Sequence, residues 1–479
     1  MADSIPQAPE AVLSTMDKAG NRNWIYPTPS HGRFWRGRLV VGWVLIAVFV
    51  ALPWIEINNR PAVFLNLLRR EFTFFGLTLH STDTALLMVF ALTVLVAVFF
   101  VTALFGRIWC GWGCPQTVYL EFVYRPVERL IEGSEVQRRR RDKGAWTSDK
   151  IWRKVVKLSV FFAISLVLAH TFVAYFAGWE NMLQWMRQSP TEAPGYFAMM
   201  AITTALVFFD FGYFREQMCT ITCPYARLQS VLMDDDSLIV SYDRGRGERR
   251  GTYRERKKSQ QALNLDGGEV RFGDCIDCGA CVRTCPTGID IRDGLQMECI
   301  SCTACVDACD DIMEAIDKPR GLIRYTSENA IAHGQTTVSR PRLYLYGVLL
   351  LILSTVLVGL VATRAPLEID VQRLRGTTYT MTNDDQVANR LSMRLRNRTG
   401  EQGTLELVPV SPDGAKVRIV GAEKPILEPG KMERMEAWVT IPDDQMPPGG
   451  RTAEIEFWFH DEVVKTLNIR ILGPHNNDH

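Results

Sequence analysis

Five long apolar segments alternate with charged connections along this chain. Each approaches the roughly 20 residues that a helix needs to cross about 30 Å of hydrocarbon. The fourth is the shortest and ends on Asp210, so a buried helix is the alternative for it. The pattern predicts an α-helical integral membrane protein with five transmembrane helices. The predicted spans are residues 39–55, 84–105, 155–177, 196–211 and 343–361.

The charges of the connections predict how the spans are oriented. Lys and Arg accumulate on the cytoplasmic side of short loops, and the second connection is rich in both while the first and third carry few. This predicts a protein of the bacterial inner membrane with a cytoplasmic N-terminus and a periplasmic C-terminus. The expected cytoplasmic segments are 1–38, 106–154 and 212–342, and the expected periplasmic segments are 56–83, 178–195 and the tail after Arg364.

Two features of the polar segments qualify this model. The first 31 residues lack the apolar core of a cleavable signal peptide, so the first span is expected to remain in the mature protein. The basic runs 138–141 and 244–258 are interpreted as topology determinants and solvated faces. Anionic lipid headgroups or an acidic electron donor are the alternative ligands for these runs.

The last 110 residues change in texture. Short runs of alternating polarity are separated by turn signals such as Pro412-Asp413-Gly414, which is typical of a β-sandwich. The runs are residues 391–395, 404–408, 417–420, 436–441 and 453–459. The domain contains no catalytic cluster, so a docking or assembly role is expected, with a passive stabilising cap as the alternative.

Charge and cysteine usage narrow the chemistry. The formal net charge is +1, so the total charge gives no argument for binding nucleic acid. All twelve cysteines lie between Cys110 and Cys309 in tight groups, which differs from the disulfide framework of a secreted protein. The cysteines are therefore interpreted as metal ligands.

Eight cysteines of the large insert form two runs with the spacing of a bacterial two-cluster ferredoxin. In this pattern three thiolates of one run and the last thiolate of the other hold each [4Fe–4S] cluster, so the ligation is crossed. Two zinc sites are the alternative, but zinc sites pair C-x2-C knuckles and do not use runs of four. The predicted ligands are Cys275, Cys278, Cys281 and Cys309 for one cluster, and Cys285, Cys299, Cys302 and Cys305 for the other.

The second run departs from the ferredoxin pattern after its last cysteine. Asp310 and Asp311 follow Cys309, where the first run has Pro286 after Cys285. Carboxylates close to a cluster are expected to lower its reduction potential, because they disfavour the added electron.

The remaining four cysteines form two C-x3-C-P motifs, one at the cytoplasmic end of the second span and one at that of the fourth. If the backbone is helical there, both thiols of a motif share one face, and the proline stops or bends the helix. Two facing motifs would give a four-thiol site for a soft metal such as Cu(I), or two disulfides. Inert buried cysteines are the alternative. The four residues are Cys110, Cys114, Cys219 and Cys223.

Other side chains near the spans give weaker signals. Trp109 and Trp112 are interpreted as ordinary interfacial tryptophans. His170 lies in the third span, where a histidine is a functional candidate, although a hydrogen-bonded bundle residue is the preferred interpretation. Met182 and Met186 could offer thioethers to copper, and an interfacial amphipathic turn is the simpler explanation for them.

The motifs WCGWGCPQTVYLEF and CTITCPYARLQSVLMDDD, with the doubled ferredoxin run, resemble the CcoG family, also called FixG or RdxA, over nearly the whole chain. The resemblance implies a C-terminal immunoglobulin-like domain and reduction of Cu(II) to Cu(I) for assembly of cytochrome cbb3 oxidase. It also implies copper chaperones or oxidase assembly factors as partners. The polyferredoxin membrane proteins of periplasmic nitrate reduction share these motifs, but the exported β-domain is not expected in them.

The resulting hypothesis is a membrane cupric reductase. A cytoplasmic donor loads the clusters, and electrons pass to copper held by the thiols of the two C-x3-C-P motifs. The alternatives are a quinol-linked electron conduit and a non-catalytic assembly scaffold whose clusters sense oxygen or iron. The predicted domains are a cytoplasmic segment 1–38, four helices in 39–211, a cytoplasmic insert 212–342 with its ferredoxin part at about 265–320, a fifth helix at 343–363 and a periplasmic domain 364–479.

Overall fold

The computed structural model describes residues 14–16, 21–57, 60–67, 70–80, 82–257, 272–334, 340–374, 376, 378–382, 384–399 and 401–474. Three parts of the sequence-based predictions lie outside this range: the first 13 residues of the N-terminal segment, Lys258 in the second basic run, and the predicted start of the ferredoxin part at about 265. The chain forms two compact units, each built from two stretches of sequence. One contains Met1–Pro53 and Leu87–Thr355, and the other Trp54–Leu86 and Val356–His479.

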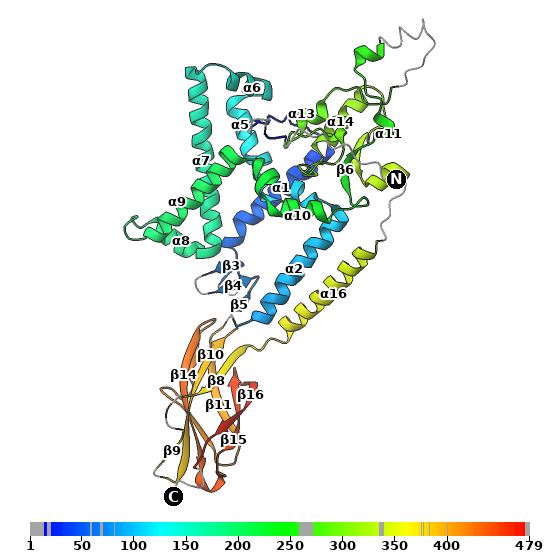
Figure 1. Cartoon of the computed structure of the whole chain (residues 1–479). Helices are drawn as coiled ribbons and strands as arrows, with labels where there is room; N and C mark the ends of the chain where they lie inside the picture. Colours follow the sequence, from blue (N-terminus) through cyan, green and yellow to red (C-terminus); the bar gives the residue numbers. More distant parts are fainter. Residues whose placement is uncertain are drawn as a thin grey trace. The chain divides into compact units, whose positions relative to one another are not determined.

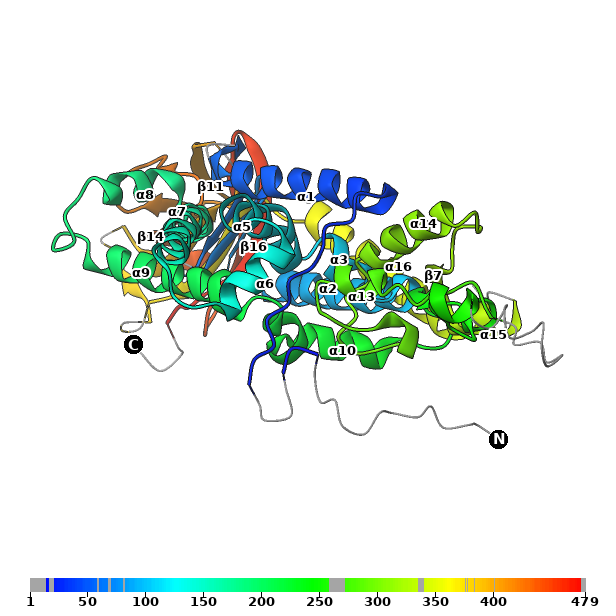
Figure 2. The same cartoon turned by 90° about the horizontal axis from the view of Figure 1, so that it is seen from above.

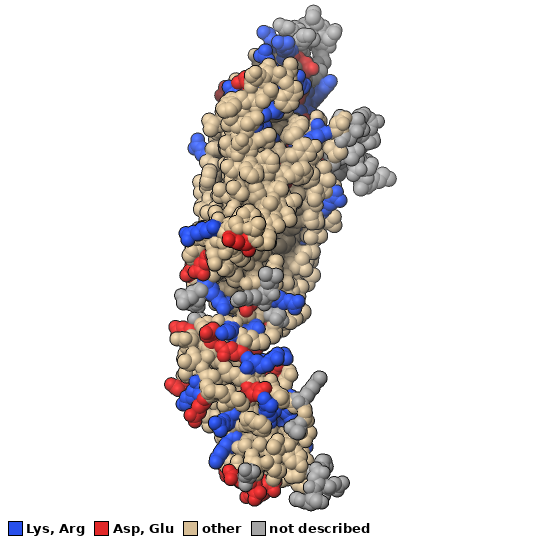
Figure 3. All heavy atoms as spheres, turned by 90° about the vertical axis from the view of Figure 1, so that its left-hand side faces the viewer, with Lys and Arg blue, Asp and Glu red and all other residues tan. Residues whose placement is uncertain are grey.

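Five helices of the described chain are long and apolar enough to cross a membrane, which confirms the predicted spans (Figure 1). The fourth helix continues without a break into a π-helical turn, η3 (Asp210–Phe214), so that the apolar segment is 21 residues long. The face that carries α7 to α9 shows a broad area without Lys, Arg, Asp or Glu (Figure 3). The five helices are α1 (Arg33–Ala51), α2 (Thr84–Phe105), α7 (Ser148–Ala177), α9 (Pro194–Phe209) and α16 (Pro341–Ala362).

Shorter helices follow the spans. After α2 the chain turns through several short helices, and α6 begins with a capping box in which Ser134 and Gln137 satisfy the free backbone amides. α7 and α9 pack against each other and lie side by side in both views (Figures 1 and 2). The short helices are η1 (Leu52–Trp54), α3 (Ile108–Trp112), α4 (Pro115–Tyr119), η2 (Leu120–Tyr124), α5 (Arg125–Glu132), α6 (Glu135–Lys143), α8 (Trp179–Met186), η4 (Met218–Thr222) and α10 (Pro224–Leu232).

The large insert folds around a two-stranded antiparallel sheet and the two cysteine runs. Tyr242 pairs with Ile323 in this sheet, and the buried core beneath it includes Val306 and Met313. The elements are β6 (Ile239–Tyr242), α11 (Arg244–Gly247), α13 (Ala280–Thr284), η5 (Ile291–Asp293), α14 (Ala304–Ala315), β7 (Ile323–Thr326) and α15 (Glu328–His333).

The C-terminal region is a β-sandwich with an immunoglobulin-like fold, as predicted. One sheet has the strand order β12-β14-β10-β8, with β9 also paired to β10, and the other has the order β13-β11-β15-β16. Alternating residues of β10 and β15 are buried, and side chains of both sheets form one core. The strands are β8 (Leu367–Arg373), β9 (Thr380–Met381), β10 (Gln386–Asn397), β11 (Gly403–Ser411), β12 (Lys416–Ile419), β13 (Ile426–Leu427), β14 (Met432–Pro442), β15 (Arg451–Phe459) and β16 (Glu462–Ile471), and η6 (Asp443–Gln445) precedes β15.

The connection between the first two spans is part of the same unit as the sandwich, which the sequence did not predict. Asp83 pairs with Arg364 and, at 2.8 Å, with Arg398. The guanidinium of Arg60 donates to the carbonyl of Pro429 at 3.4 Å. The connection itself forms the strands β1 (Glu56–Ile57), β2 (Arg60–Pro61), β3 (Val63–Asn66), β4 (Glu71–Phe74) and β5 (Leu77–His80).

Candidate functional site

The eight thiols of the insert form the two groups that crossed ligation requires. Cys302, Cys299 and Cys285 are the three strongest of the cysteine neighbours whose charges act on Cys305, ahead of Cys281, and all of them line one small cavity with it. Cys275, Cys278 and Cys281 act in the same way on Cys309 and line a second cavity with it. The first group therefore combines the last cysteine of the first run with the first three of the second run. The other group combines the first three cysteines of the first run with the last one of the second run, which is the arrangement expected from the spacing.

The two runs hold their thiols with the same backbone geometry. Asp277 and Gly279 in the first run have φ of +49° and +64°, and the equivalent Ser301 and Thr303 have +53° and +61°. Residues with left-handed backbone conformation turn neighbouring N–H groups toward one point, and the concave loop that results favours binding of an anion. Each loop then begins a helix, α13 or α14, which carries the third cysteine of its run. The repeated geometry is suited to a net-negative iron–sulfur cluster.

Burial and mutual repulsion raise the pKa of five of these thiols, those of Cys281, Cys299, Cys302, Cys305 and Cys309. Burial raises the pKa of Cys299 to about 11 and that of Cys302 to about 12, and the pKa of Cys309 also rises to about 12. Only a thiolate ligates iron, so these thiols must lose their protons when the cluster binds. The positive charge that stabilises the thiolates then comes from the iron itself. Two sets of four thiols, buried or partly buried except for the exposed Cys278, fit two [4Fe–4S] clusters in this respect.

In the described part of the chain, no three His, Cys, Asp or Glu side chains are close enough together to hold one metal ion. A zinc site would need four ligands on a single ion. A cubane cluster separates its ligands by its own iron and sulfide, so a wider spacing of the eight thiols is compatible with a cluster.

The two C-x3-C-P motifs share a geometry that differs from the continuous helix considered for them. Cys110 lies inside α3 and Cys219 inside η4, but Cys114 and Cys223 have extended backbone with ψ of 126° and 110°. The amide of Cys114 donates to the carbonyl five residues earlier, and so does that of Cys223. The proline after each motif occupies the first position of the next helix, α4 or α10, where its missing N–H costs nothing.

The four thiols of these motifs lie together. Burial raises the pKa of Cys219, and the neighbouring Cys114, Cys110 and Cys223 raise it further. The pKa of Cys110 and that of Cys114 are also raised, chiefly by burial. The two motifs thus face one another, as expected, although their thiols do not surround a single ion.

A glutamine completes this thiol group. The Cys110 thiol donates to Gln229 Oε1 at 3.1 Å, and Gln229 is 1% exposed. Gln229 lies on α10, one helix beyond the second motif, and its amide nitrogen reaches Thr102 at the end of α2. The sequence did not single out Gln229, because a glutamine in an apolar helix has no spacing signature.

The membrane thiols touch one ferredoxin thiol group directly. Cys110, Ile300 and Cys302 form a buried cluster against which Cys219 packs. A Cβ atom on Gly111 would lie 2.6 Å from the carbonyl oxygen of Ile300 and 2.9 Å from the amide nitrogen of Cys302. Only glycine permits this approach, so the backbone of the first motif lies against the backbone that carries a predicted cluster ligand.

Two buried arginines lie at this contact. Burial raises the pKa of Cys110, Cys299 and Cys302, and a nearby guanidinium offsets part of this rise. The guanidinium is that of Arg107 for Cys110 and Cys299, and that of Arg38 for Cys302. Arg107 also donates to the carbonyl of Met297, and Arg38 Nε donates to the carbonyl of Gly111 at 2.9 Å. The two cations therefore favour negative charge on both thiol groups and hold the loops that carry them.

The insert is docked on the first span by a helix cap. Asp307 on α14 is 2% exposed and accepts hydrogen bonds from the amides of Phe34 and Trp35, at 3.1 and 2.7 Å. These amides belong to the first turn of α1, which has no partner within the helix for them. Trp112 donates to the hydroxyl of Tyr325 at 3.1 Å, so it also joins the first C-x3-C-P motif to the insert.

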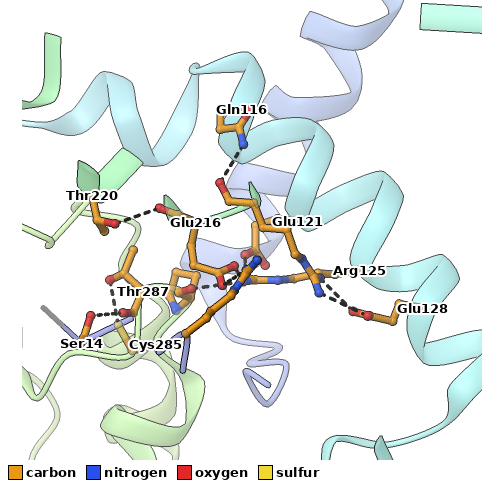
Figure 4. Close-up of polar contacts among 12 residues, drawn as sticks. Ser14, Gln116, Glu121, Arg125, Glu128, Glu216, Thr220, Cys285 and Thr287 are labelled. Atoms are coloured by element: carbon orange, nitrogen blue, oxygen red, sulfur yellow. Dashed lines mark hydrogen bonds and ion pairs between the residues drawn. The ribbon is translucent and has the colours of Figure 1, made fainter. Parts of the chain in front are cut away.

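Arg125 links the spans to the loop that carries Cys285 (Figure 4). Its guanidinium pairs with Glu121 and Glu216, and donates to the carbonyl of Pro286 at 3.1 Å. The hydroxyl of Thr287 lies 3.4 Å from the Cys285 thiol. An ion network of the membrane helices thereby fixes the position of one predicted cluster ligand.

A second ion network centres on Glu128 of α5. Glu128 is 3% exposed and lies 2.7 Å from Arg138 and 2.9 Å from Arg215. Burial alone would raise the pKa of Glu128, but Arg215, Lys157 and Arg138 outweigh burial and lower it. The prediction that the run 138–141 is solvated is wrong for Arg138, which is 2% exposed.

The weaker candidates do not join the thiol site. His170 Nδ1 donates to the carbonyl of Leu166 at 2.8 Å, as a bundle histidine would. Met182 is buried in a cluster with Tyr196 and Met200, and Met186 is half exposed. Asp310 accepts from the amide of Gly321 at 2.8 Å and raises the pKa of the adjacent Cys309 thiol.

Three family models match the chain. Residues 87–133 match a 4Fe-4S binding domain, and residues 214–328 match a 4Fe-4S dicluster domain. Residues 357–474 match the IG-like fold at the C-terminus of FixG. One C-x3-C-P motif lies in each of the two iron–sulfur regions.

Curated relatives align over most of their length. The chain is 33% identical to the nitrogen fixation protein FixG of Rhizobium meliloti, over 94% of this chain and 93% of the relative. It is 33% identical to protein RdxA of Cereibacter sphaeroides, over 84% and 85%, and 30% identical to protein RdxB of the same organism, over 92% and 93%.

Proposed function

Because this chain belongs to the FixG family of membrane iron–sulfur electron-transfer proteins, we propose that it passes electrons from its clusters to Cu(II). The Cu(I) formed is used to assemble a cbb3-type cytochrome oxidase, with copper chaperones or oxidase assembly factors as partners. A cytoplasmic donor supplies the electrons. The lipid bilayer that holds the protein is the inner membrane, with the N-terminus in the cytoplasm and the β-sandwich in the periplasm.

The two thiol groups of the insert assign the cluster ligands in this proposal. When bound, each [4Fe–4S] cluster supplies one electron at a time. The chain holds the clusters through thiols of which only Cys278 is exposed, and it fixes the Cys285 loop through Arg125. The ligands are Cys275, Cys278, Cys281 and Cys309 for one cluster, and Cys285, Cys299, Cys302 and Cys305 for the other.

Copper is the substrate, and the thiols of the two C-x3-C-P motifs are its proposed ligands. Thiolates are soft and favour Cu(I), so they stabilise the product of a one-electron reduction. Cu(II) gains one electron, a reduced cluster loses one, and no thiol is consumed. The proposed catalytic residues are Cys110, Cys114, Cys219 and Cys223.

The contact between Gly111 and Cys302 supports this proposal more than any other observation. It joins a predicted cluster ligand to a motif that has two thiols and no other assigned role. Electrons that reach the Cys285, Cys299, Cys302 and Cys305 group are therefore next to the four membrane thiols, with no water layer between the two groups.

The test is the double variant Cys110→Ser and Cys114→Ser in the purified full-length protein. Hydroxyls are hard ligands, so the variant should keep its clusters and its reduction by dithionite but lose reoxidation by Cu(II) and most Cu(I) binding. The Thr220→Val variant, in the second motif, keeps all thiols and should behave like the parent.

Two results would contradict the copper assignment. Reoxidation by Cu(II) at the parental rate, with unchanged Cu(I) binding, would make the membrane thiols structural. Iron near twelve per parent chain, in place of about eight, would mean that these four thiols hold a third cluster.

A further inference from the structure

A groove between α7 and α9 is separate from the thiol site. It has a volume of about 680 Å³, within the roughly 300–1,000 Å³ that is usual for small-molecule sites. Its wall is almost wholly apolar and includes Phe162, Leu166, Met200 and Phe208. Leu166 is 38% exposed and Phe162 51%, so the groove opens toward the lipid side of the spans. We call it the α7–α9 groove.

Two residues that line the α7–α9 groove each have a buried hydroxyl without a hydrogen-bond partner among the described residues. The hydroxyls are Tyr196 Oη and Thr204 Oγ1, in residues that are 6% and 4% exposed. The neighbouring Thr203, on the same helix, donates to the carbonyl of Met199 at 2.8 Å. Thr204 could satisfy itself in the same way and does not. Buried hydroxyls in hydrocarbon have no water to bond, so a ligand in the groove that they reach by rotation of the side chain would satisfy them.

A hydrogen-bond acceptor also lines the groove. Nδ1 of His170 donates to a backbone carbonyl, which leaves the lone pair of Nε2 free to accept in the neutral imidazole. The His170 ring lies 6.4 Å from the ring of Tyr196, centroid to centroid. The ring of Trp185 packs against that of Tyr196, with the two centroids 5.4 Å apart.

We propose that the α7–α9 groove binds the ring of an isoprenoid quinone or quinol. A quinone ring is flat and carries two carbonyl oxygens that accept from hydroxyls such as those of Tyr196 and Thr204. In the quinol form its hydroxyls can donate to His170 Nε2. The tail continues along the apolar wall into the bilayer, which no polar ligand could do. An acyl chain would fill the wall but leave both hydroxyls unsatisfied.

The test measures binding of decylubiquinone to the full-length, oxidised protein in lipid nanodiscs without copper. Tryptophan emission is the readout, because Trp185 packs against Tyr196, which lines the groove. Losing one hydrogen bond of ordinary strength weakens binding by about two- to tenfold, so Tyr196→Phe and Thr204→Val should each do so. Thr203→Val makes the matched change one residue away and should leave the affinity unchanged.

Decylbenzene has the same tail but no carbonyl, and it should not compete with decylubiquinone on the parent protein. Parental affinity in the combined Tyr196→Phe and Thr204→Val variant would overturn the proposal, and so would equal competition by decylbenzene, which would identify an acyl-chain groove. The competition uses the unaltered chain and so does not depend on a variant folding. The measurement involves no electron transfer, so its outcome is independent of the copper proposal.

Discussion

Replacing Gly111 by Ala tests whether the contact between the two thiol groups carries electrons. The added Cβ would lie 2.6 Å from the Ile300 carbonyl oxygen and 2.8 Å from Cys302 Cα. Both atoms belong to the backbone, which cannot rotate away as a side chain can. One of the two loops must therefore move by several tenths of an ångström.

Two opposing free energies decide the size of the effect. Overpacking a tight contact costs about 1–3 kcal/mol. Alanine in place of glycine stabilises a helix by about 0.5–1 kcal/mol, and Gly111 lies in α3. The net cost of about 0–2.5 kcal/mol falls on the docked arrangement and lowers its population relative to the undocked one by up to about seventyfold.

The assay mixes dithionite-reduced, full-length protein with Cu(II) and follows the loss of the reduced-cluster EPR signal. Gly111→Ala should keep its iron content and slow this reoxidation. Gly113→Ala is the matched control in the same loop, because its Cβ would meet only the ring of Trp109, which is 47% exposed and can move. Parental reoxidation in Gly111→Ala, at parental iron content, would refute the idea that electrons leave through this contact.

Three further predictions follow from buried groups. Cys278→Ala should lower iron from about eight toward four per chain, since one cluster loses a ligand, and unchanged iron and EPR would contradict the assignment. Glu128→Gln leaves Arg138 and Arg215 buried without their carboxylate, so the free energy of unfolding should fall by about 3–5 kcal/mol, measured as a lower thermal midpoint. Burial, with Arg396 and other nearby cations, lowers the pKa of His80 to about 3. Below pH 6.5 the unfolded chain therefore binds a proton at His80, whereas the folded chain does not until the pH falls to about 3. Between pH 6.5 and 3 the β-domain should therefore lose up to about 1.4 kcal/mol per pH unit, and urea titrations of His80→Gln should show a weaker pH dependence.

The sequence predicted the features that depend on local spacing. Apolar runs gave the spans, alternation gave strands such as β10 and β15, and cysteine spacing gave the two thiol groups. These patterns need no knowledge of the rest of the chain, since a helix, a strand or a cysteine loop is determined within about 20 residues.

Contacts between distant segments could not be predicted in this way. Asp307 caps a helix 273 residues earlier, and nothing near Asp307 differs from an ordinary helical aspartate. Gly111 is one of two glycines in its motif, and only the approach of Ile300 distinguishes it from Gly113. The burial of Arg138 likewise depends on Glu128, which lies on another helix.

The ion pairs of Asp83 have a consequence for how often the chain crosses the bilayer. Asp83 precedes α2, and its partners Arg364 and Arg398 follow α16, yet charged partners can meet only on one side of a membrane. The number of crossings between them must therefore be even, and α2, α7, α9 and α16 make four. If the short α9 were a buried helix that did not cross, three crossings would leave about 30 Å of hydrocarbon between the carboxylate and both guanidiniums. With α2, α7 and α16 crossing the membrane, an even number of crossings thus requires α9 to cross as well.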